Sequence, residues 1–253
     1  MSDYHPEPYW SAVADRIKSR GDHNVIAGDD EPFYRYKRNR FLSMLLSVDF
    51  KDKSVLEIGH GPGGNLLEIM KKAPSRLAGA DISDAMIALA KENTQNRVEL
   101  FKTDGTKLPF KDGAFDLVFS ATVLQHNSDD KMMRALLAEM CRVSSNEVYL
   151  FEKVDSKIVG DDLCFARPVE YYHGLVKEEG FELNEVSHIN IRSSYYVCGA
   201  SRKLLNKPSR TEGEPLSSLS IWVQKITLPI TKILDRIFTS KKDVAKMRFI
   251  RKS

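Results

Sequence analysis

The chain has 253 residues, 42% of them hydrophobic, which suits one globular domain of ordinary size with an appendage. Its three cysteines lie far apart without a Cys-x-x-Cys pair, which argues against a disulfide framework or a zinc knuckle. It has no apolar run long enough to cross a bilayer and no signal-peptide core, so we expect a cytoplasmic protein. The net charge of +3 is uneven, because nine basic and two acidic residues give residues 216–253 a charge of +7 and leave −4 for the rest.

Residues 1–52 precede the first predicted strand and carry two predicted helices, 9–20 and 33–47. The second helix leads into that strand, so its N-terminal half should lie near the strand's carboxyl end, where ligands bind in α/β sheets. Tyr34 and Arg38 would then be able to reach a bound ligand. The alternative is that they are solvated helix residues or pair with acids just before the helix.

Residues 55–66 predict a short buried strand, a glycine-rich turn and the start of a helix. Gly59, Gly61 and Gly63 allow positive φ and leave no Cβ where a ligand must touch the backbone. The helix that follows directs its free N–H groups and positive dipole end toward that ligand. The spacing Gly-x-Gly-x-Gly, two residues after Glu57, differs from the dinucleotide fingerprint. A tight strand–helix turn without a ligand is the alternative.

The next two predicted strands, 76–81 and 97–102, both lead to acidic residues. Asp81 lies about twenty residues after the loop, where an acid accepts hydrogen bonds from ribose hydroxyls in nucleotide-binding sheets. Ile82 is placed to pack on an adenine ring. Asp104, followed by Gly105, is placed to accept from the adenine amino group.

The rest of the chain continues the alternation of strands and helices. We predict strands at 113–120 and 147–151, a helix at 129–143 between them, and a helix at 168–180. The Val, Ile and Tyr content of 181–191 and 195–202 predicts an antiparallel pair at one sheet edge, with the core complete at Lys203.

Four spaced signals together resemble the class I S-adenosylmethionine (SAM)-dependent methyltransferases over about residues 53–202. They are Glu57-x-Gly59-x-Gly61-x-Gly63, Asp81, Asp104-Gly105 and Gly113-x-Phe115-Asp116-x-Val118. The resemblance implies an α/β, Rossmann-like doubly wound sheet of seven mostly parallel strands, the last antiparallel. It implies SAM as the cofactor, with its amino-acid half on the glycine loop and near Tyr34 and Arg38, its ribose on the second-strand acid and its adenine on the third. Ser120, at the end of the fourth strand, joins this predicted cofactor site. His60 departs from the smaller residues usual in the loop, and we expect only its backbone to line it.

Methyl transfer is an in-line attack on a sulfonium methyl group, for which the protein mainly supplies orientation and desolvation. A hydroxyl acceptor also needs a base with a pKa near neutrality, and His126 is the candidate. Many relatives have a similar Leu-x-His with varied substrates, so packing or positioning is the alternative. Glu152 is a second candidate for holding an acceptor hydroxyl, unless it pairs with Lys153 or Arg167. No carboxylate cluster indicates a required metal.

Three functions compete. The first is a methyltransferase that acts on a hydroxyl of a glycan or another small molecule. The second is a nicotinamide dehydrogenase, which the glycine spacing disfavours. The third is a non-catalytic SAM-binding scaffold. A nucleic-acid acceptor is not expected, because the domain is slightly acidic and an Asn-Pro-Pro-Tyr-type motif is absent after the fourth strand. The segments 27–30 and 34–38 are similar to methyltransferases found with surface-polysaccharide assembly, which favours a sugar hydroxyl. Lipid or quinone acceptors are the second choice.

We divide the chain into an N-terminal helical cap and substrate lid (1–52), the SAM-binding domain (53–203), a linker (204–218) and a basic amphipathic tail (219–253). In the tail, apolar residues recur at helical spacing beside lysines and arginines, as in an interfacial membrane helix. The protein would then be peripheral at the inner face of an anionic membrane. Contact with its own domain or with a protein partner is the alternative. The apolar tail residues are Leu219, Trp222, Val223, Ile226, Ile230, Ile233, Leu234, Ile237 and Phe238.

Overall fold

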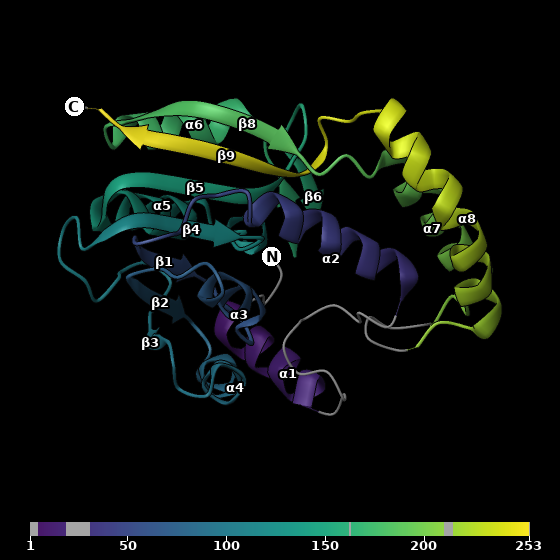
Figure 1. Cartoon of the computed structure of the whole chain (residues 1–253), viewed down its shortest axis with the longest axis horizontal. Coiled ribbons are helices and arrows are strands. Elements are labelled where there is room, and N and C mark those ends of the chain that lie inside the picture. The colour runs from purple at the N-terminus through teal and green to yellow at the C-terminus, as the bar shows by residue number, and fades with distance from the viewer. Residues whose placement is uncertain (1–4, 19–30, 162, 210–214, 253) are drawn as a thin grey trace.

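The computed structural model describes residues 5–18, 31–161, 163–209 and 215–252. Within them, helices cover both faces of one large mixed sheet (Figure 1). Its strands are β1 (Ser54–Ile58), β2 (Arg76–Asp81), β3 (Glu99–Lys102), β4 (Phe115–Ala121), β5 (Ser144–Val154), β8 (Phe181–His188) and β9 (Asp243–Arg251). A separate hairpin is formed by β6 (Val159–Asp161) and β7 (Cys164–Ala166).

The helices alternate with the strands as predicted up to β8. They are α1 (Pro6–Lys18), α2 (Pro32–Leu45), α3 (Gly64–Met70), α4 (Asp84–Thr94), α5 (Asp130–Val143), α6 (Val169–Glu178), α7 (Arg192–Leu204) and α8 (Ser218–Ile237). A single 3₁₀ turn, η1 (Leu124–His126), follows β4.

The seven strands lie in the order β3-β2-β1-β4-β5-β9-β8. The first five are parallel, and β9 is antiparallel to both of its neighbours. This order confirms the Rossmann-like doubly wound sheet of seven mostly parallel strands. The carboxyl ends of β1 and β4 meet at the point where the strand order reverses, which is where ligands bind in such sheets.

The prediction of a strand at 195–202 is wrong, because these residues lie in α7. Their β-branched and aromatic side chains suggested a strand, but the buried positions are Ser194, Cys198 and Ser201. That spacing of four and three residues is helical, and small side chains form the buried face. Tyr195 and Tyr196, which carried the strand signal, are exposed.

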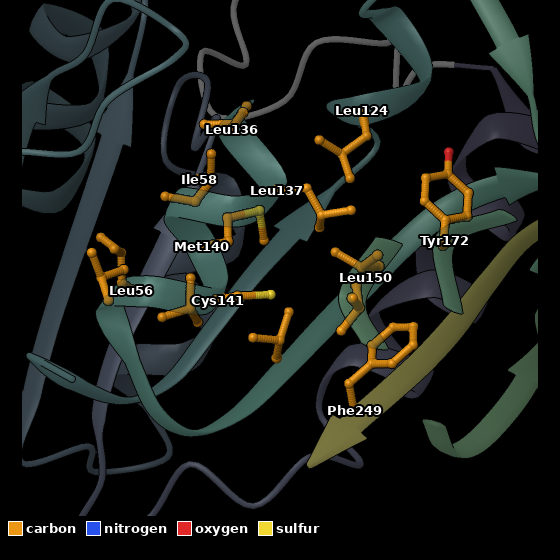
Figure 2. Close-up of a cluster of buried hydrophobic side chains, with 14 of the residues drawn as sticks. Leu56, Ile58, Leu124, Leu136, Leu137, Met140, Cys141, Leu150, Tyr172 and Phe249 are labelled. Carbon is orange, nitrogen blue, oxygen red and sulfur yellow. The ribbon is translucent and has the colours of Figure 1, made fainter. Parts of the chain in front are cut away.

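The prediction that the core is complete at Lys203 is also wrong, because β9 lies between β5 and β8. Val244, Met247 and Phe249 are buried on this strand. Figure 2 shows Phe249 in the same cluster as Leu150 of β5. The last residues of the predicted tail are therefore part of the central sheet.

Several basic residues assigned to the tail are neutralised in and around this sheet. Lys246 pairs with Glu185 of β8 at 2.8 Å. Arg248 pairs with Glu147 of β5, a carboxylate that is almost fully buried and also accepts from Lys53 at 2.8 Å. These charges help to fix β9 between its two partners, and they are not available to an external anionic surface.

We predict that Phe249→Ala lowers the free energy of unfolding by about 3–5 kcal/mol, the usual cost of removing a buried aromatic side chain. Phe238→Ala is the matched control, since Phe238 is exposed between α8 and β9. It should change stability by no more than about 0.5 kcal/mol. Urea denaturation of both variants measures this difference, and equal small losses would contradict a core position for β9.

Candidate active site

The glycine loop connects β1 to α3 and adopts the left-handed backbone that the sequence predicts. The φ angles of Gly59, Gly61 and Gly63 are +67°, +53° and +88°. A Cβ on Gly59 would lie 2.4 Å from Cγ2 of Val123, so a larger residue would collide with the turn after β4. The glycines therefore let two loops approach each other at the reversal point of the sheet.

Asp81, at the end of β2, holds the loop in place. Its Oδ2 accepts from the backbone N–H of Gly61 at 2.9 Å, and its Oδ1 accepts from the N–H of Ser83 at 2.8 Å. The carboxylate is buried but also lines the cavity. Each carboxylate oxygen has two lone pairs, so Asp81 can accept a further hydrogen bond from a ligand hydroxyl.

Glu57 lies in β1, directly before the glycine loop. Its Oε1 accepts from Nδ2 of Asn65 at 2.6 Å, and Asn65 in turn accepts from Arg38 at 2.7 Å. Within the described residues, its Oε2 is buried without a hydrogen-bond partner. Burial raises the pKa of Glu57 to about 8. Glu57 does not itself line the cavity, so its predicted contact with the cofactor stays a prediction.

His60 is buried, and its ring supports the loop from below. Its Nδ1 donates to the carbonyl of Gly61 at 2.7 Å. The ring packs over Gly79 of β2, where a Cβ would lie 2.7 Å from the imidazole Cδ2. Burial lowers the pKa of His60, which favours the neutral ring. The unusual residue in the loop is thus matched by a glycine on the neighbouring strand.

A cavity of about 340 Å³ opens along this edge of the sheet. One part of its wall is formed by the glycine loop, Asp81, Ile82 and Gly105, and Met132 of α5 closes this end. The other part is formed by side chains from α1, α2, η1 and β9, which are Trp10, Lys37, Phe41, His126 and Val244. The first part suits a nucleoside and the second leaves room for an acceptor.

Tyr34 and Arg38 both line the cavity, as the helix prediction required. Arg38 points to Asn65, while the hydroxyl of Tyr34 accepts from Arg202 of α7 at 2.7 Å. Whether they bind the carboxylate of SAM stays a prediction. The segment 27–30, which entered the resemblance to polysaccharide-associated methyltransferases, lies outside the described residues.

Asp104 lies outside the cavity wall, which Thr103 and Gly105 form at this point. The side chain is exposed, and its Oδ1 accepts from the N–H groups of Thr106 and Lys107 at 2.8 Å each. These hydrogen bonds hold the pKa of Asp104 below its ordinary value. The structure thus shows Asp104 closing a turn, and the predicted contact with adenine stays a prediction.

Ser120 and Glu152 lie under the cavity floor and are fully buried. Ser120 donates to Oε1 of Glu152 at 2.8 Å, and the N–H groups of Val123 and Gln125 donate to the same carboxylate at 3.1 Å each. Burial raises the pKa of Glu152. Neither residue lines the cavity, so the structure does not bring them to the ligand. Glu152 holds the turn after β4 through these hydrogen bonds.

His126 lies at the end of that turn and faces the cavity. Its Nδ1 donates to the carbonyl of Leu163 at 2.7 Å, so Nε2 carries the lone pair. The side-chain amide of Gln125 lies 3.1 Å from Nε2. The ring of Trp10 contacts the imidazole edge-on, with 5.1 Å between the ring centroids. Because Nδ1 donates to this carbonyl, Nε2 is the ring nitrogen that is left to act as an acceptor.

Three residues that build the site were not predicted from the sequence. Asn65 links Arg38 to Glu57, and its position in the first turn of the helix after the loop was a usable signal. Arg167 is buried and donates to the carbonyls on either side of His126 at 2.9 and 2.8 Å. Trp10 reaches the cavity from α1, and no local pattern indicates this.

Within the described residues, no group of three or more His, Cys, Asp or Glu side chains is arranged to hold a metal ion.

Residues 55–147 match the family model described as "Methyltransferase domain". Two solved structures are similar over nearly the whole chain. The cyclase SpnF has a TM-score of 0.68 with 16% identity, covering 97% of this chain and 94% of its own. Magnesium protoporphyrin IX methyltransferase from Synechocystis PCC 6803, with bound SAM, has a TM-score of 0.61 with 12% identity and covers all of both chains. The fold is that of a class I SAM-dependent methyltransferase.

Curated relatives match over a shorter stretch. Ajmaline N-methyltransferase from Rauvolfia serpentina is 31% identical over 102 residues, which are 38% of this chain and 34% of the relative. Demethylmenaquinone methyltransferase from Thermus thermophilus is 31% identical over 102 residues, which are 39% and 45% of the two chains. The chain thus spans less than half the length of these curated relatives.

The residues present fit SAM. The left-handed glycine loop leaves its backbone open to the ligand, Asp81 on the cavity wall offers acceptors to a ribose, and the buried Oε2 of Glu57 behind the loop has no hydrogen-bond partner among the described residues. Aliphatic and thioether groups from Ile82 and Met132 suit the faces of a purine.

We predict that Asp81→Ala weakens SAM binding by about 1–3 kcal/mol, because it removes a buried acceptor from both the loop and the ligand. Asp104→Ala should weaken binding less, since its carboxylate closes a turn outside the cavity. Calorimetry on both variants, with circular dichroism as a check of the fold, measures the difference. Unchanged affinity in Asp81→Ala would contradict this position of the ribose.

We also predict a pH-dependent difference in stability between Glu57→Gln and the wild type. A carboxyl group whose pKa is raised by folding adds stability below its unfolded pKa, and this stability is lost as the pH rises toward about 8. Glutamine does not titrate, so the melting temperature of the variant relative to wild type should rise between about pH 5 and pH 8. Glu178→Gln, which changes an exposed carboxylate, is the control. Parallel profiles for Glu57→Gln and wild type would contradict burial of an ionisable carboxyl.

Proposed function

We propose that this protein is a SAM-dependent methyltransferase that transfers a methyl group to a hydroxyl of a small molecule. The observation that carries the proposal is one cavity that joins the glycine loop and Asp81 at one end to the imidazole of His126 at the other. SAM supplies a methyl group on a positively charged sulfur, which departs as a neutral sulfide. The chain has to align the acceptor, exclude water and take up one proton.

The residues divide this work between them. Glu57 and Asn65 hold the amino-acid end of the cofactor, and Asp81 holds the ribose. Trp10 and Phe41 give the acceptor end apolar walls that exclude water. His126 takes the hydroxyl proton at Nε2, because the carbonyl of Leu163 keeps the other ring nitrogen protonated. An acceptor hydroxyl would displace the amide of Gln125 from Nε2.

The turn that carries His126 is held from two sides. Glu152 accepts from its backbone N–H groups, and Arg167 donates to its backbone carbonyls. Both side chains are buried, so the turn is fixed before an acceptor enters. In this proposal Glu152 is a positioning residue, which replaces the earlier hypothesis that it contacts the acceptor.

A sugar hydroxyl is our first acceptor class, and a lipid or a quinone is the second. The second class is favoured by the apolar acceptor end of the cavity and by the name of the Thermus thermophilus relative, a demethylmenaquinone methyltransferase. Labelled SAM incubated with the protein and fractionated cell extract distinguishes the classes by whether label enters the aqueous or the organic phase. No transfer to either phase, with SAM bound, would favour a SAM-binding scaffold. The solved cyclase with the same fold shows that the fold alone does not fix the reaction.

We predict that His126→Ala lowers kcat by about 10²–10⁴-fold and leaves SAM affinity nearly unchanged, because the base acts only in the transfer step. Rapid-quench measurement of a single turnover isolates that step. A near-normal rate would mean that His126 packs against Trp10 and does not act as a base.

A further inference from the structure

Helix α8 is amphipathic, and its apolar face points away from the protein. It has six large apolar side chains, each between 50 and 65% exposed. Figure 1 shows α8 along one end of the molecule, beside α7 and away from the sheet. The helix is continuous through Pro229. The six side chains are Leu219, Trp222, Ile226, Ile230, Ile233 and Ile237, and Phe238 directly after the helix is 55% exposed.

The opposite, polar face of α8 is the buried one. Asp235 is almost fully buried and accepts from the N–H groups of Ser193 and Ser194 at the start of α7, at 2.6 and 3.1 Å. Its other oxygen accepts from the hydroxyl of Tyr36 on α2. Gln224, which lies on the same buried face of α8, accepts from the backbone N–H of Phe33 at 3.2 Å.

These buried polar contacts fix the rotation of the helix. Turning α8 to bury its apolar face would expose the partners of Asp235 and leave a carboxylate without them, which is costly. One of the alternatives thus holds for the polar face, through which α8 packs on α7 and α2 of its own chain, and this packing leaves the apolar face exposed. The apolar face remains for an external partner.

Basic residues line one edge of the apolar face. Lys225 follows Trp222 by three residues, Arg236 follows Ile233 by three, and Lys232 lies between them on the same side of the helix. All three are exposed, and none has a carboxylate partner within the described residues. The acid of this helix, Asp235, faces inward. The outer face is therefore apolar, with basic residues along one edge and no acidic side chain.

The chain that follows α8 leads back toward the acceptor end of the cavity. The chain leaving α8 reaches Lys242, which pairs with Asp155 at 2.9 Å, just before the β6–β7 hairpin. The same hairpin exposes Ile158 and Val159, and the carbonyl of Leu163 accepts from His126. The chain leaving α8 is thus anchored beside the hairpin whose loop contacts His126.

We propose that the outer face of α8 docks on an anionic membrane surface and brings the cavity next to acceptors carried there. Large apolar side chains beside lysines and arginines are what partitioning into a lipid interface requires. A second copy of the chain is the weaker occupant, because pairing two such faces would bring two basic rows together without acids to oppose them. Among the described residues, no helix combines the length and apolar character needed to cross a bilayer, so docking would be peripheral. The part of the proposal that concerns acceptors rests on the proposed methyl transfer, while docking itself does not.

Vesicle flotation of the full chain tests the docking. Wild type should float with phosphatidylcholine vesicles that contain phosphatidylglycerol at low ionic strength, and much less with phosphatidylcholine alone. Replacing Lys225, Lys232 and Arg236 by Gln should weaken partitioning about 100-fold, at about fivefold for each basic residue near an anionic surface. The matched control replaces Lys72, Lys91 and Lys131, exposed lysines on other elements, by Gln and should float like wild type.

A second variant, Trp222→Gln with Ile230→Gln, tests the apolar part and should also lose flotation. Calorimetric binding of SAM reports the fold of every variant, so loss of flotation with SAM bound normally supports the docking surface. Wild type that stays in the soluble fraction, or a triple Gln variant that floats like wild type, would overturn the proposal. The face would be assigned to a second copy if wild type does not float and light scattering shows that it is a dimer. In that case only the double variant at Trp222 and Ile230 should be monomeric. None of these outcomes depends on methyl transfer, so docking and the proposed reaction fail separately.

Discussion

The position of β9 between β5 and β8 constrains the rest of the chain. It pairs antiparallel with both strands along most of its length, so it supplies hydrogen-bond partners to two backbones that would otherwise be sheet edges. The segment that links β8 to β9 must therefore leave the sheet and return to its middle. Helices α7 and α8 form this excursion, and they lie at the end of the sheet where the cavity opens. Val244, at the start of β9, lines that cavity.

A single buried carboxylate then decides which way α8 faces. Asp235 accepts from the first N–H groups of α7, from a serine hydroxyl and from Tyr36 of α2. Three elements share this one acceptor, and burial raises the pKa of Tyr36 to about 12 with Asp235 adding to the shift. A carboxylate placed at a helix N-terminus is favourable, whereas the same group exposed to an apolar partner would not be. The apolar face of α8 thus points outward because its polar face is held inward by these hydrogen bonds.

Local patterns predicted the parts of the site that depend on local geometry. The glycine loop, Asp81 and the main strands from β1 to β8 follow from spacing, because they depend on residues close together in the chain; the β6–β7 hairpin was not predicted. The position of β9 did not, since it depends on pairing between segments about ninety residues apart. The orientation of α8 did not either. Hydrophobic periodicity shows which residues share a face, and only the buried partners of Asp235 show which face lies inside.

Several polar residues that could take part in chemistry do not line the cavity and instead support it. Glu152 and Ser120 support the floor, Asp104 closes a turn, and Arg167 fixes the turn before His126. A reaction with a good leaving group needs an aligned acceptor more than it needs several acids and bases. Buried supports that hold one imidazole and one glycine loop in fixed positions meet that need. The polar residues of this edge are therefore arranged for positioning, and in the proposed reaction His126 is the group that takes up the proton.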